Sequence, residues 1–222
     1  MIFGPLSTTT YAVNGVSFDM VRLPPGRFVD GNGDLSREVL VSRPFEIGIK
    51  PVSQTLWRAV MGEVLVDLSG PGFPVWNVSH DNVQEFLVRL SVFGLTGFRL
   101  PTDSEWAWVA RCGASTGWAG ADRAESVAVI NAAQAEPAAR RKVNAAGTFD
   151  LSGNLCEWTA DWRQRFSGSG VDLSGPPSGL SRSIRGGCWA YASENVRVTA
   201  RSGLDPNLSN RFIGVRLLRS TS

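Results

Sequence analysis

The chain has 222 residues, 43% of them hydrophobic, and its 22 basic and 20 acidic side chains leave a net charge of +2. This length and composition are typical of one soluble globular domain with a sizeable core. The basic residues form no run or stripe, and no segment has the pattern of a signal peptide or a membrane span. We therefore expect no nucleic-acid partner and no direct membrane insertion, with a cytoplasmic location as the default expectation.

Strand patterns and one helix occupy the first part of the chain. Hydrophobic and polar side chains alternate within residues 13–30 up to a Pro-Pro-Gly turn, which predicts a strand that leads into a hairpin. Residues 39–49 predict another strand. Ser53 is placed to cap a short helix, Gln54–Met61, which Gly62 is expected to end.

Two further helices carry clear start signals. After a loop-like stretch at residues 63–78, Ser79 is placed to cap a helix whose apolar side chains recur at helical spacing up to Gly94. Thr102 opens a capping box directly after a proline, so a third helix is expected to begin there and to end near Cys112.

The second half of the chain is less regular. Residues 114–148 are rich in Ala, Gly and Asn and predict a long irregular excursion, whereas strand patterns return near residues 185–189, 196–201 and 213–219. No internal repeat, linker or charge block divides the chain. We therefore predict one domain over residues 1–222, of the α+β class, with two or more helices packed on antiparallel strands.

Four separated motifs share their order and spacing with one family. They are PFEIG, continued by VSQ and a tryptophan, at residues 44–57, FRLPTDSEW at 98–106, GNLCEWT at 153–159 and RGGCW at 185–189. In this arrangement the chain resembles the formylglycine-generating-enzyme (sulfatase-modifying factor) domain over residues 13–218. The resemblance implies a C-type-lectin-like fold of that type: a small twisted antiparallel sheet, two or more helices and much irregular structure.

The catalytic residues of the resembled enzymes have no counterpart in this chain. Those enzymes place a pair of cysteines shortly after the Arg-Gly-Gly motif and use the thiolates to bind copper and activate oxygen. Here the corresponding residues 190–197 contain no cysteine, and Cys188 has no partner nearby in sequence. A Cu(I) site needs two such soft ligands, so we expect no enzyme activity. The alternative is a catalytic member of the superfamily that carries out an oxygen-dependent oxidation.

Cysteine and histidine numbers exclude further kinds of site. The three cysteines, Cys112, Cys156 and Cys188, are too few and too widely spaced for a disulfide framework or a zinc site, so we expect them to be buried and unpaired. A relative that builds ergothioneine needs several histidines for its iron, whereas His80 is the single histidine here. We expect His80 to be a solvated or capping residue at the start of a helix.

The C-terminal part also resembles a second group with this fold, the variable proteins of diversity-generating retroelements. In that group a segment between RGGSW and IGFRL sequences is rewritten by adenine-directed mutagenesis through a reverse transcriptase. This chain has RGGCW at residues 185–189 and IGVRL at 213–217, and it departs from the pattern only modestly, at Cys188 and Val215. The resemblance implies a variable region at about residues 185–218 that binds a macromolecular ligand of unknown identity.

The residues between these anchor sequences have the composition of a binding surface, with aromatic and arginine side chains among small polar ones. We expect Trp189, Val196, Val198, Ile213 and Val215 to point inward and to hold the backbone, because core positions tolerate change poorly. An ordinary surface loop is the alternative interpretation. The predicted ligand-binding residues are Ala190, Tyr191, Ala192, Glu194, Asn195, Ala200, Ser202, Gly203, Leu204, Asp205, Leu208, Asn210, Arg211 and Phe212.

No cofactor is required by this interpretation, but the resemblance implies a structural calcium ion. Asp150, Gly153, Leu155 and Glu157 match positions at which the resembled enzymes hold one. Two carboxylates and two backbone carbonyls are oxygen ligands of the kind that Ca²⁺ prefers. In the alternative interpretation, the two carboxylates only hydrogen-bond the surrounding loop.

Overall fold

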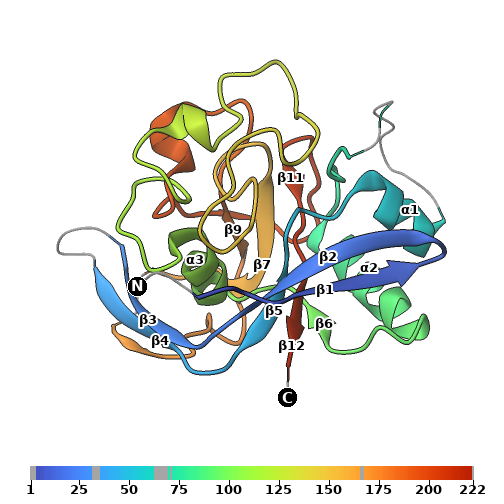
Figure 1. The fold of residues 1–222 in the computed structure, drawn as a ribbon, viewed down its shortest axis with the longest axis horizontal. Helices are drawn as coiled ribbons and strands as arrows, with labels where there is room; N and C mark the ends of the chain where they lie inside the picture. Colours follow the sequence, from blue (N-terminus) through green and yellow to red (C-terminus); the bar gives the residue numbers. More distant parts are fainter. Residues whose placement is uncertain (1–3, 32–35, 63–69, 71, 166–167, 222) are drawn as a thin grey trace.

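The largest sheet brings the two halves of the chain together. The structure is a computed structural model that describes residues 4–31, 36–62, 70, 72–165 and 168–221. Within this part of the chain, the C-terminal strand lies between two strands of the first half, and all pairs in the sheet are antiparallel (Figure 1). The strands in spatial order are β1 (Thr8–Val13), β2 (Val16–Leu23), β5 (Phe45–Gly48), β12 (Leu218–Ser220) and β6 (Phe98–Arg99).

Two smaller sheets flank the largest one, and each contains one parallel pair of strands. The four-stranded sheet has the order β10 (Ser202–Leu204), β9 (Arg182–Arg185), β7 (Cys156–Trp162) and β11 (Ile213–Gly214). The three-stranded sheet has the order β3 (Gly26–Asp30), β4 (Arg37–Val41) and β8 (Gly170–Val171).

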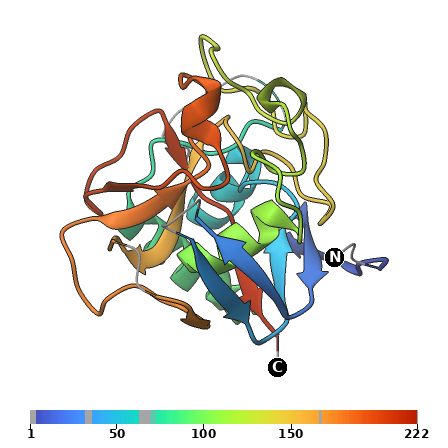
Figure 2. The same cartoon turned by 90° about the vertical axis from the view of Figure 1, so that its left-hand side faces the viewer.

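Two of the helices begin where their predicted caps lie. Helix α1 (Gln54–Met61) is capped by the hydroxyl of Ser53 and ends one residue before a glycine in the left-handed conformation. Helix α3 (Asp103–Arg111) starts with the predicted capping box of Thr102 and Glu105. The caps satisfy N–H groups that a helix start leaves unpaired. The Thr102 cap fixes the start of α3. This helix packs between the β3–β4 sheet and strands β7 and β9 (Figure 2).

Helix α2 (His80–Val92) is capped by Ser79 as predicted, but the expectation of a solvated His80 is wrong. His80 is 4% exposed, and its ring stands edge-on to Trp158 with the ring centres 5.6 Å apart. Its backbone N–H donates to the carbonyl of Pro206 at 2.9 Å. The chain after β10 therefore folds over the start of α2 and covers the histidine, a contact between segments distant in sequence.

Three strand predictions differ from the structure. The pattern at residues 39–49 divides into two strands, β4 and β5, in different sheets. Strand β7 was not predicted, because its first four residues are buried on both faces and show no alternation. Residues 196–201 are not a strand: Val196 ends a short 3₁₀ helix, and the N–H of Val198 donates to the carbonyl of Gly117 outside any named strand.

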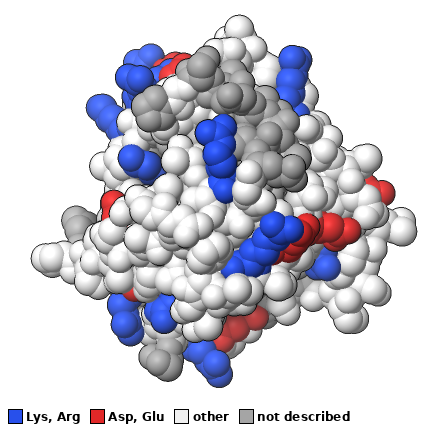
Figure 3. All heavy atoms as spheres, turned by 90° about the vertical axis from the view of Figure 1, so that its right-hand side faces the viewer, with Lys and Arg blue, Asp and Glu red and all other residues white. Residues whose placement is uncertain are grey.

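The irregular regions agree with the sequence where they are described. Of the loop expected at residues 63–78, residues 63–69 and 71 lie outside the described part of the chain. The excursion at residues 114–148 contains a single short 3₁₀ helix, Ala124–Ser126, and no named strand. None of the helices in the described part is long and apolar enough to cross a membrane. On the face that carries α1 and α2, basic and acidic side chains are scattered and intermingled (Figure 3).

A buried ion pair joins the sheets at the centre of the molecule. Arg216 and Glu157 are both 0% exposed, and Arg216 donates to both carboxylate oxygens of Glu157 at 2.7 to 3.1 Å. Its Nη1 donates to the carbonyl of Gly48 at 2.8 Å, and its Nη2 donates also to the carbonyl of Phe149 at 2.7 Å. The indole N–H of Trp106 donates to Glu157 at 2.7 Å. Because hydrogen bonds surround both charges, they are tolerated in the core.

Arg216→Leu should lower the free energy of unfolding by about 3–5 kcal/mol, because it leaves the Glu157 carboxylate buried without its counterion. The matched control is Arg89→Leu, which breaks a half-exposed pair with Glu85 and should cost about 0.2–1 kcal/mol. Urea unfolding followed by tryptophan fluorescence measures both changes. Equal, small effects in the two variants would contradict the central role of Arg216.

Candidate ligand-binding surface

The segment of residues 190–212 follows β9 and leads to β11, and its strand β10 is the edge strand of the same four-stranded sheet. It passes through the 3₁₀ helix Ser193–Val196 and strand β10, drawn in orange-red to red in Figure 2. Gly187, just before the segment, has φ 69°, and a Cβ there would lie 2.6 Å from the side chain of Val196. Only glycine combines that conformation with such a close approach, so the entry to the segment is fixed by its backbone.

The inward-pointing anchors are confirmed: Val196, Val198, Ile213 and Val215 are at most 1% exposed, and Trp189 is 6% exposed. All fourteen predicted ligand-binding residues, in contrast, reach the surface at least in part. The half-buried ones are Ala200, Gly203, Leu204, Asn210 and Phe212, and the exposed ones are Ala190, Tyr191, Ala192, Glu194, Asn195, Ser202, Asp205, Leu208 and Arg211.

Four of the predicted residues surround a hollow of about 340 Å³, called here the first hollow. Tyr191 and Asn195 line it from the start of the segment, and Ala200 and Ser202 line it from the stretch that leads into β10. Its lining also includes Cys156 at the start of β7. The structure thus brings together residues from both arms of the segment around one polar opening.

A second hollow, of about 430 Å³, lies around Trp189 and Arg211. The guanidinium of Arg211 stands 5.1 Å from the ring centre of Trp189, within the range of a cation–π contact. Trp76, Asn77 and Gln134 also line it, beside two alanines. Sequence reasoning missed these three residues, because they come from loops far from the segment and follow no motif that points to binding.

Phe212 contacts a lining residue of each hollow. Its ring packs against Trp189 of the second hollow at 5.1 Å, and its backbone carbonyl accepts a hydrogen bond from Cys156 of the first hollow at 2.8 Å. The remaining predicted residues line neither hollow. They are Ala190, Ala192, Glu194, Gly203, Leu204, Asp205, Leu208, Asn210 and Phe212.

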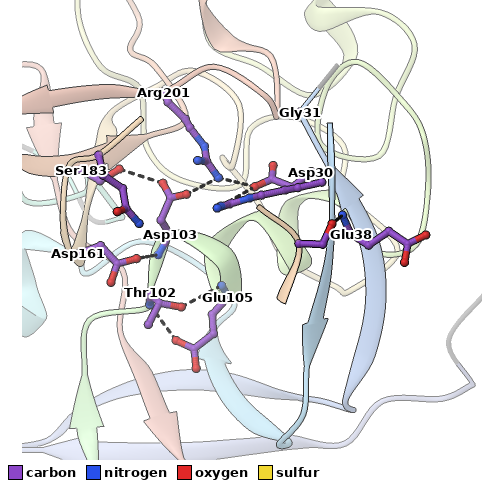
Figure 4. Close-up of polar contacts among 12 residues, drawn as sticks. Asp30, Gly31, Glu38, Thr102, Asp103, Glu105, Asp161, Ser183 and Arg201 are labelled. Carbon is purple, nitrogen blue, oxygen red and sulfur yellow. Dashed lines mark hydrogen bonds and ion pairs between the residues drawn. The ribbon is translucent and has the colours of Figure 1, made fainter. Parts of the chain in front are cut away.

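A network of buried charged side chains lies on the inner side of the segment of residues 190–212 (Figure 4). Arg201 pairs with Asp103 at 2.5 Å and with Asp30, and Arg185 approaches Asp103 at 3.4 Å. Burial acts to raise the pKa of Asp103, but the two arginines outweigh it and hold this pKa below its ordinary value. Arg185 also donates to two carbonyls within residues 198–200, at 2.8 and 3.0 Å, so the network holds the backbone in place.

Among the predicted calcium ligands, Asp150, Gly153, Leu155 and Glu157, the two carboxylates differ in the contacts that they already make. Arg216 and Trp106 already donate to the carboxylate of Glu157, which would place a guanidinium beside the metal. Asp150 accepts a hydrogen bond from the backbone N–H of Ala139 at 3.0 Å, and its burial raises its pKa. No group of three or more His, Cys, Asp or Glu residues in the described ranges is arranged for a metal. Glu157 thus bonds within the protein, as in the alternative, whereas the buried Oδ1 of Asp150 has no hydrogen-bond partner, so the calcium site stays a prediction.

Comparison with known protein families covers nearly the whole chain. The profile of the sulfatase-modifying factor enzyme 1-like domain matches residues 11–221. The chain belongs to this family. The formylglycine-generating enzyme of Streptomyces coelicolor is 28% identical to this domain over 185 residues, which cover 72% of this chain and 57% of that enzyme. The serine/threonine-protein kinase pkn1 of Chlamydia caviae is 29% identical over 147 residues, but the chain spans only 23% of that kinase's length.

Solved structures confirm the predicted α+β, C-type-lectin-like fold of this sulfatase-modifying factor-like domain. Treponema denticola variable protein 1 superposes with a TM-score of 0.88 and 26% identity, over 96% of this chain and 99% of that one. The U1 variant of Major Tropism Determinant shares the fold at a TM-score of 0.51 and 14% identity, over 93% of this chain and 65% of that one.

Combined replacement of Tyr191, Asn195 and Ser202 by alanine should lower the free energy of unfolding by less than about 2 kcal/mol, because exposed side chains contribute little to the core. Trp189→Ala, a change in the buried anchor next to them, should cost about 3–5 kcal/mol. Thermal and urea unfolding of both variants give the comparison. Unfolding of the triple variant at room temperature would show that the first hollow is part of the core.

Acid should destabilise the domain partly through His80, whose pKa is lowered to about 4 by burial and, to a lesser extent, by Arg182. This value lies below the ordinary 6.5, so between these pH values the unfolded chain binds more protons and stability falls with the pH. His80→Gln should remove a loss on the order of 2 kcal/mol across that window. Urea unfolding from pH 7 to about 4 measures the difference from the wild type, in which the carboxylates common to both proteins cancel. Identical pH profiles would refute the assignment.

Proposed function

We propose that this domain is a ligand-binding protein of the variable-protein type, which displays a diversifiable surface on residues 190–212 and carries out no catalysis. The observation that carries the proposal is the sharp division of this region into buried anchors and exposed positions. Trp189 and Ile213 hold the two ends of the segment in the core, whereas its predicted ligand-binding side chains contribute little to packing. Such a division is what a surface needs if its side chains are to change while its backbone stays the same.

The residues that line the two hollows favour a macromolecular ligand. Tyrosine, tryptophan and arginine, which recur at the energetic centres of protein interfaces, are here represented by Tyr191, Trp189 and Arg211. Asn195 and Ser202 add short polar groups that adapt their hydrogen bonds to different partners. A protein surface can place one side chain in each of the two hollows. The similarity to Treponema denticola variable protein 1, over nearly the full length of both chains, agrees with this use.

The arrangement around the hollows gives no support to the catalytic alternative. Residues 190–197, which follow the Arg-Gly-Gly-Cys-Trp motif, lack the cysteine pair of the resembled enzymes. His80 is the only histidine of the chain, and it lies in the core against Trp158 and lines neither hollow. Neither hollow is therefore lined by histidine, the commonest general base.

A display library tests the proposed binding surface. Randomising Tyr191, Asn195, Ser202 and Arg211 together, with the anchors kept, should yield mostly folded domains from which binders to an unrelated test protein can be selected. A control library that randomises Val196, Val198, Ile213 and Val215 should yield almost no folded members, because these side chains are buried. Failure of the first library to fold, or to deliver any binder, would contradict the proposal.

Two further observations separate the proposal from its alternatives. A near-copy of the coding segment for residues 190–217 beside the gene, differing mainly at adenines, is expected for a diversified protein and not for an ordinary surface loop. Purified protein supplied with copper and oxygen should leave the cysteine of a sulfatase-type peptide unchanged. Conversion of that cysteine to formylglycine would establish the catalytic alternative instead.

A further inference from the structure

The second hollow differs from the first in the charges that line it. In the first hollow, Arg185 and Arg201 already pair with Asp103. In the second hollow, Arg211 is the single charged residue of the lining. That lining includes neither an acidic side chain nor a cysteine, since the three cysteines lie buried and free elsewhere, as predicted. The second hollow therefore carries a positive charge that its own walls do not neutralise.

The guanidinium of Arg211 is held in position but has no acceptor. Its central carbon stands 5.1 Å from the ring centres of both Trp189 and Phe212. The backbone carbonyl of Arg211 accepts from the indole N–H of Trp189 at 3.4 Å. Among the residues that the structure describes, however, none accepts a hydrogen bond from this guanidinium and no carboxylate pairs with it. Contacts with ring faces leave the N–H groups at the edge of the guanidinium open to a ligand.

Two other arginines near the surface show which partner such a group takes in this domain. Arg99 donates to both carboxylate oxygens of Glu105, at 2.7 and 2.6 Å. Arg141 donates to both carboxylate oxygens of Glu136, at 3.0 and 3.1 Å. In each pair the planar guanidinium matches the two oxygens of one carboxylate. Arg211 has the same donors and lacks this partner within the described part of the chain.

Trp76 supplies a second donor without an acceptor. The indole N–H groups of Trp106 and Trp158 donate to Glu157 and to the carbonyl of Val78, at 2.7 and 2.9 Å. Trp76 is also buried, at 8% exposed, but its indole N–H donates to no described residue. The indole nitrogen of Trp76 is not among the fully buried unpaired atoms, so it keeps contact with solvent. Because Trp76 lines the second hollow, this donor is open to a ligand there.

Backbone hydrogen bonds hold two distant loops against the segment of residues 190–212. The N–H of Asn77 donates to the carbonyl of Asn210 at 3.1 Å, and the N–H of Ala132 donates to the carbonyl of Trp189 at 2.9 Å. These two bonds fix the walls that the loops contribute to the second hollow, whatever side chains the segment presents. Donors held by the main chain lose little freedom when a ligand binds.

We propose that the second hollow binds the side-chain carboxylate of an aspartate or glutamate on a protein ligand, through the guanidinium of Arg211 and the indole N–H of Trp76. A carboxylate only accepts hydrogen bonds, and it carries the charge that the hollow lacks. The side-chain amides of Asn77 and Gln134, which bond no other described residue, supply further donors. This inference rests on the proposed function, because it names the chemistry that the binding surface recognises.

The donors divide into a constant and a changeable part. Trp76, Asn77 and Gln134 lie outside residues 190–212, whereas Arg211 lies within the segment proposed to diversify. A change of Arg211 therefore removes the charge and keeps the other donors. The preference for a group that only accepts hydrogen bonds belongs in part to the constant domain, and Arg211 makes this particular surface select an anion.

The test uses N-acetylglutamic acid α-amide as the probe, because it presents one side-chain carboxylate. N-acetylglutamine α-amide is its uncharged isostere. Each is titrated into the full chain at constant ionic strength, and the indole N–H signals are followed by ¹⁵N-correlated NMR. With the acid, the signals of Trp76 and Trp189 should shift and saturate, with a dissociation constant on the order of 1–100 mM, the range of one or two charge-assisted hydrogen bonds. With the amide they should not shift.

Three variants assign the contacts. Arg211→Gln should abolish the saturable shift, because it removes the charge and the paired donors. Trp76→Phe keeps a ring in place and removes the indole N–H, so it should weaken binding about two- to tenfold, with Trp189 as the reporter. The matched control is Arg89→Gln on α2, a half-exposed arginine that lines neither hollow and should leave binding unchanged. Thermal unfolding checks that each variant is folded.

Three results would overturn the carboxylate site: no saturating shift in the wild type, equal shifts with the two probes, or unchanged binding in Arg211→Gln. The display library described above tests the proposed function separately. Selected binders together with a failed titration would leave the proposed function standing and remove the carboxylate site. A saturating titration together with a library that delivers no binder would keep the carboxylate contact and remove the protein ligand.

Discussion

The ion pair of Glu157 with Arg216 is the interaction on which the arrangement of this domain depends. It links β7 to the last part of the chain, and through the carbonyls of Gly48 and Phe149 it also holds the end of β5 and the loop before β7. Desolvation offsets much of the attraction in such a pair. Its effect is to permit one arrangement of the strands, since any other would leave a charge in the core without a partner.

A second group of charges does the same for the exposed segment. Arg185 and Arg201 meet the carboxylate of Asp103, and Arg185 hydrogen-bonds the backbone of residues 198–200 from below. Backbone positions are thus set by contacts that do not involve the exposed side chains. The residues that determine the fold thus differ from the residues proposed to contact a ligand. Within the segment, the two kinds follow one another closely in the sequence.

The local features of this fold were predictable from the sequence, and the features that depend on distant contacts were not. The caps Ser53, Ser79 and Thr102 mark helix starts because a cap acts within one turn. Residues 196–201 alternate like a strand only because Val196 and Val198 are buried on one side of an irregular stretch. The covering of His80 and the second hollow arise from segments that no local pattern connects.

The local parts of the candidate site were also predictable from the sequence, and its long-range contacts were not. Motif order located the exposed segment and its anchors, since both are properties of consecutive residues. The pairing of Glu157 with Arg216 depends on a fold that brings together residues 59 positions apart in the sequence. The calcium site inferred by resemblance stays a prediction, although Arg216, from a distant part of the chain, already pairs with the Glu157 carboxylate.

The two ends of the exposed segment are held at almost the same place. The N–H of Trp189 donates to the carbonyl of Asn154, and the carbonyl of Phe212 accepts from the N–H of Cys156, so entry and exit are held two residues apart at the start of β7. For a loop whose ends are fixed in this way, each doubling of length costs only about 0.6 kcal/mol in closure entropy. Length, as well as sequence, is thus a property that this segment can change without disturbing the domain that carries it.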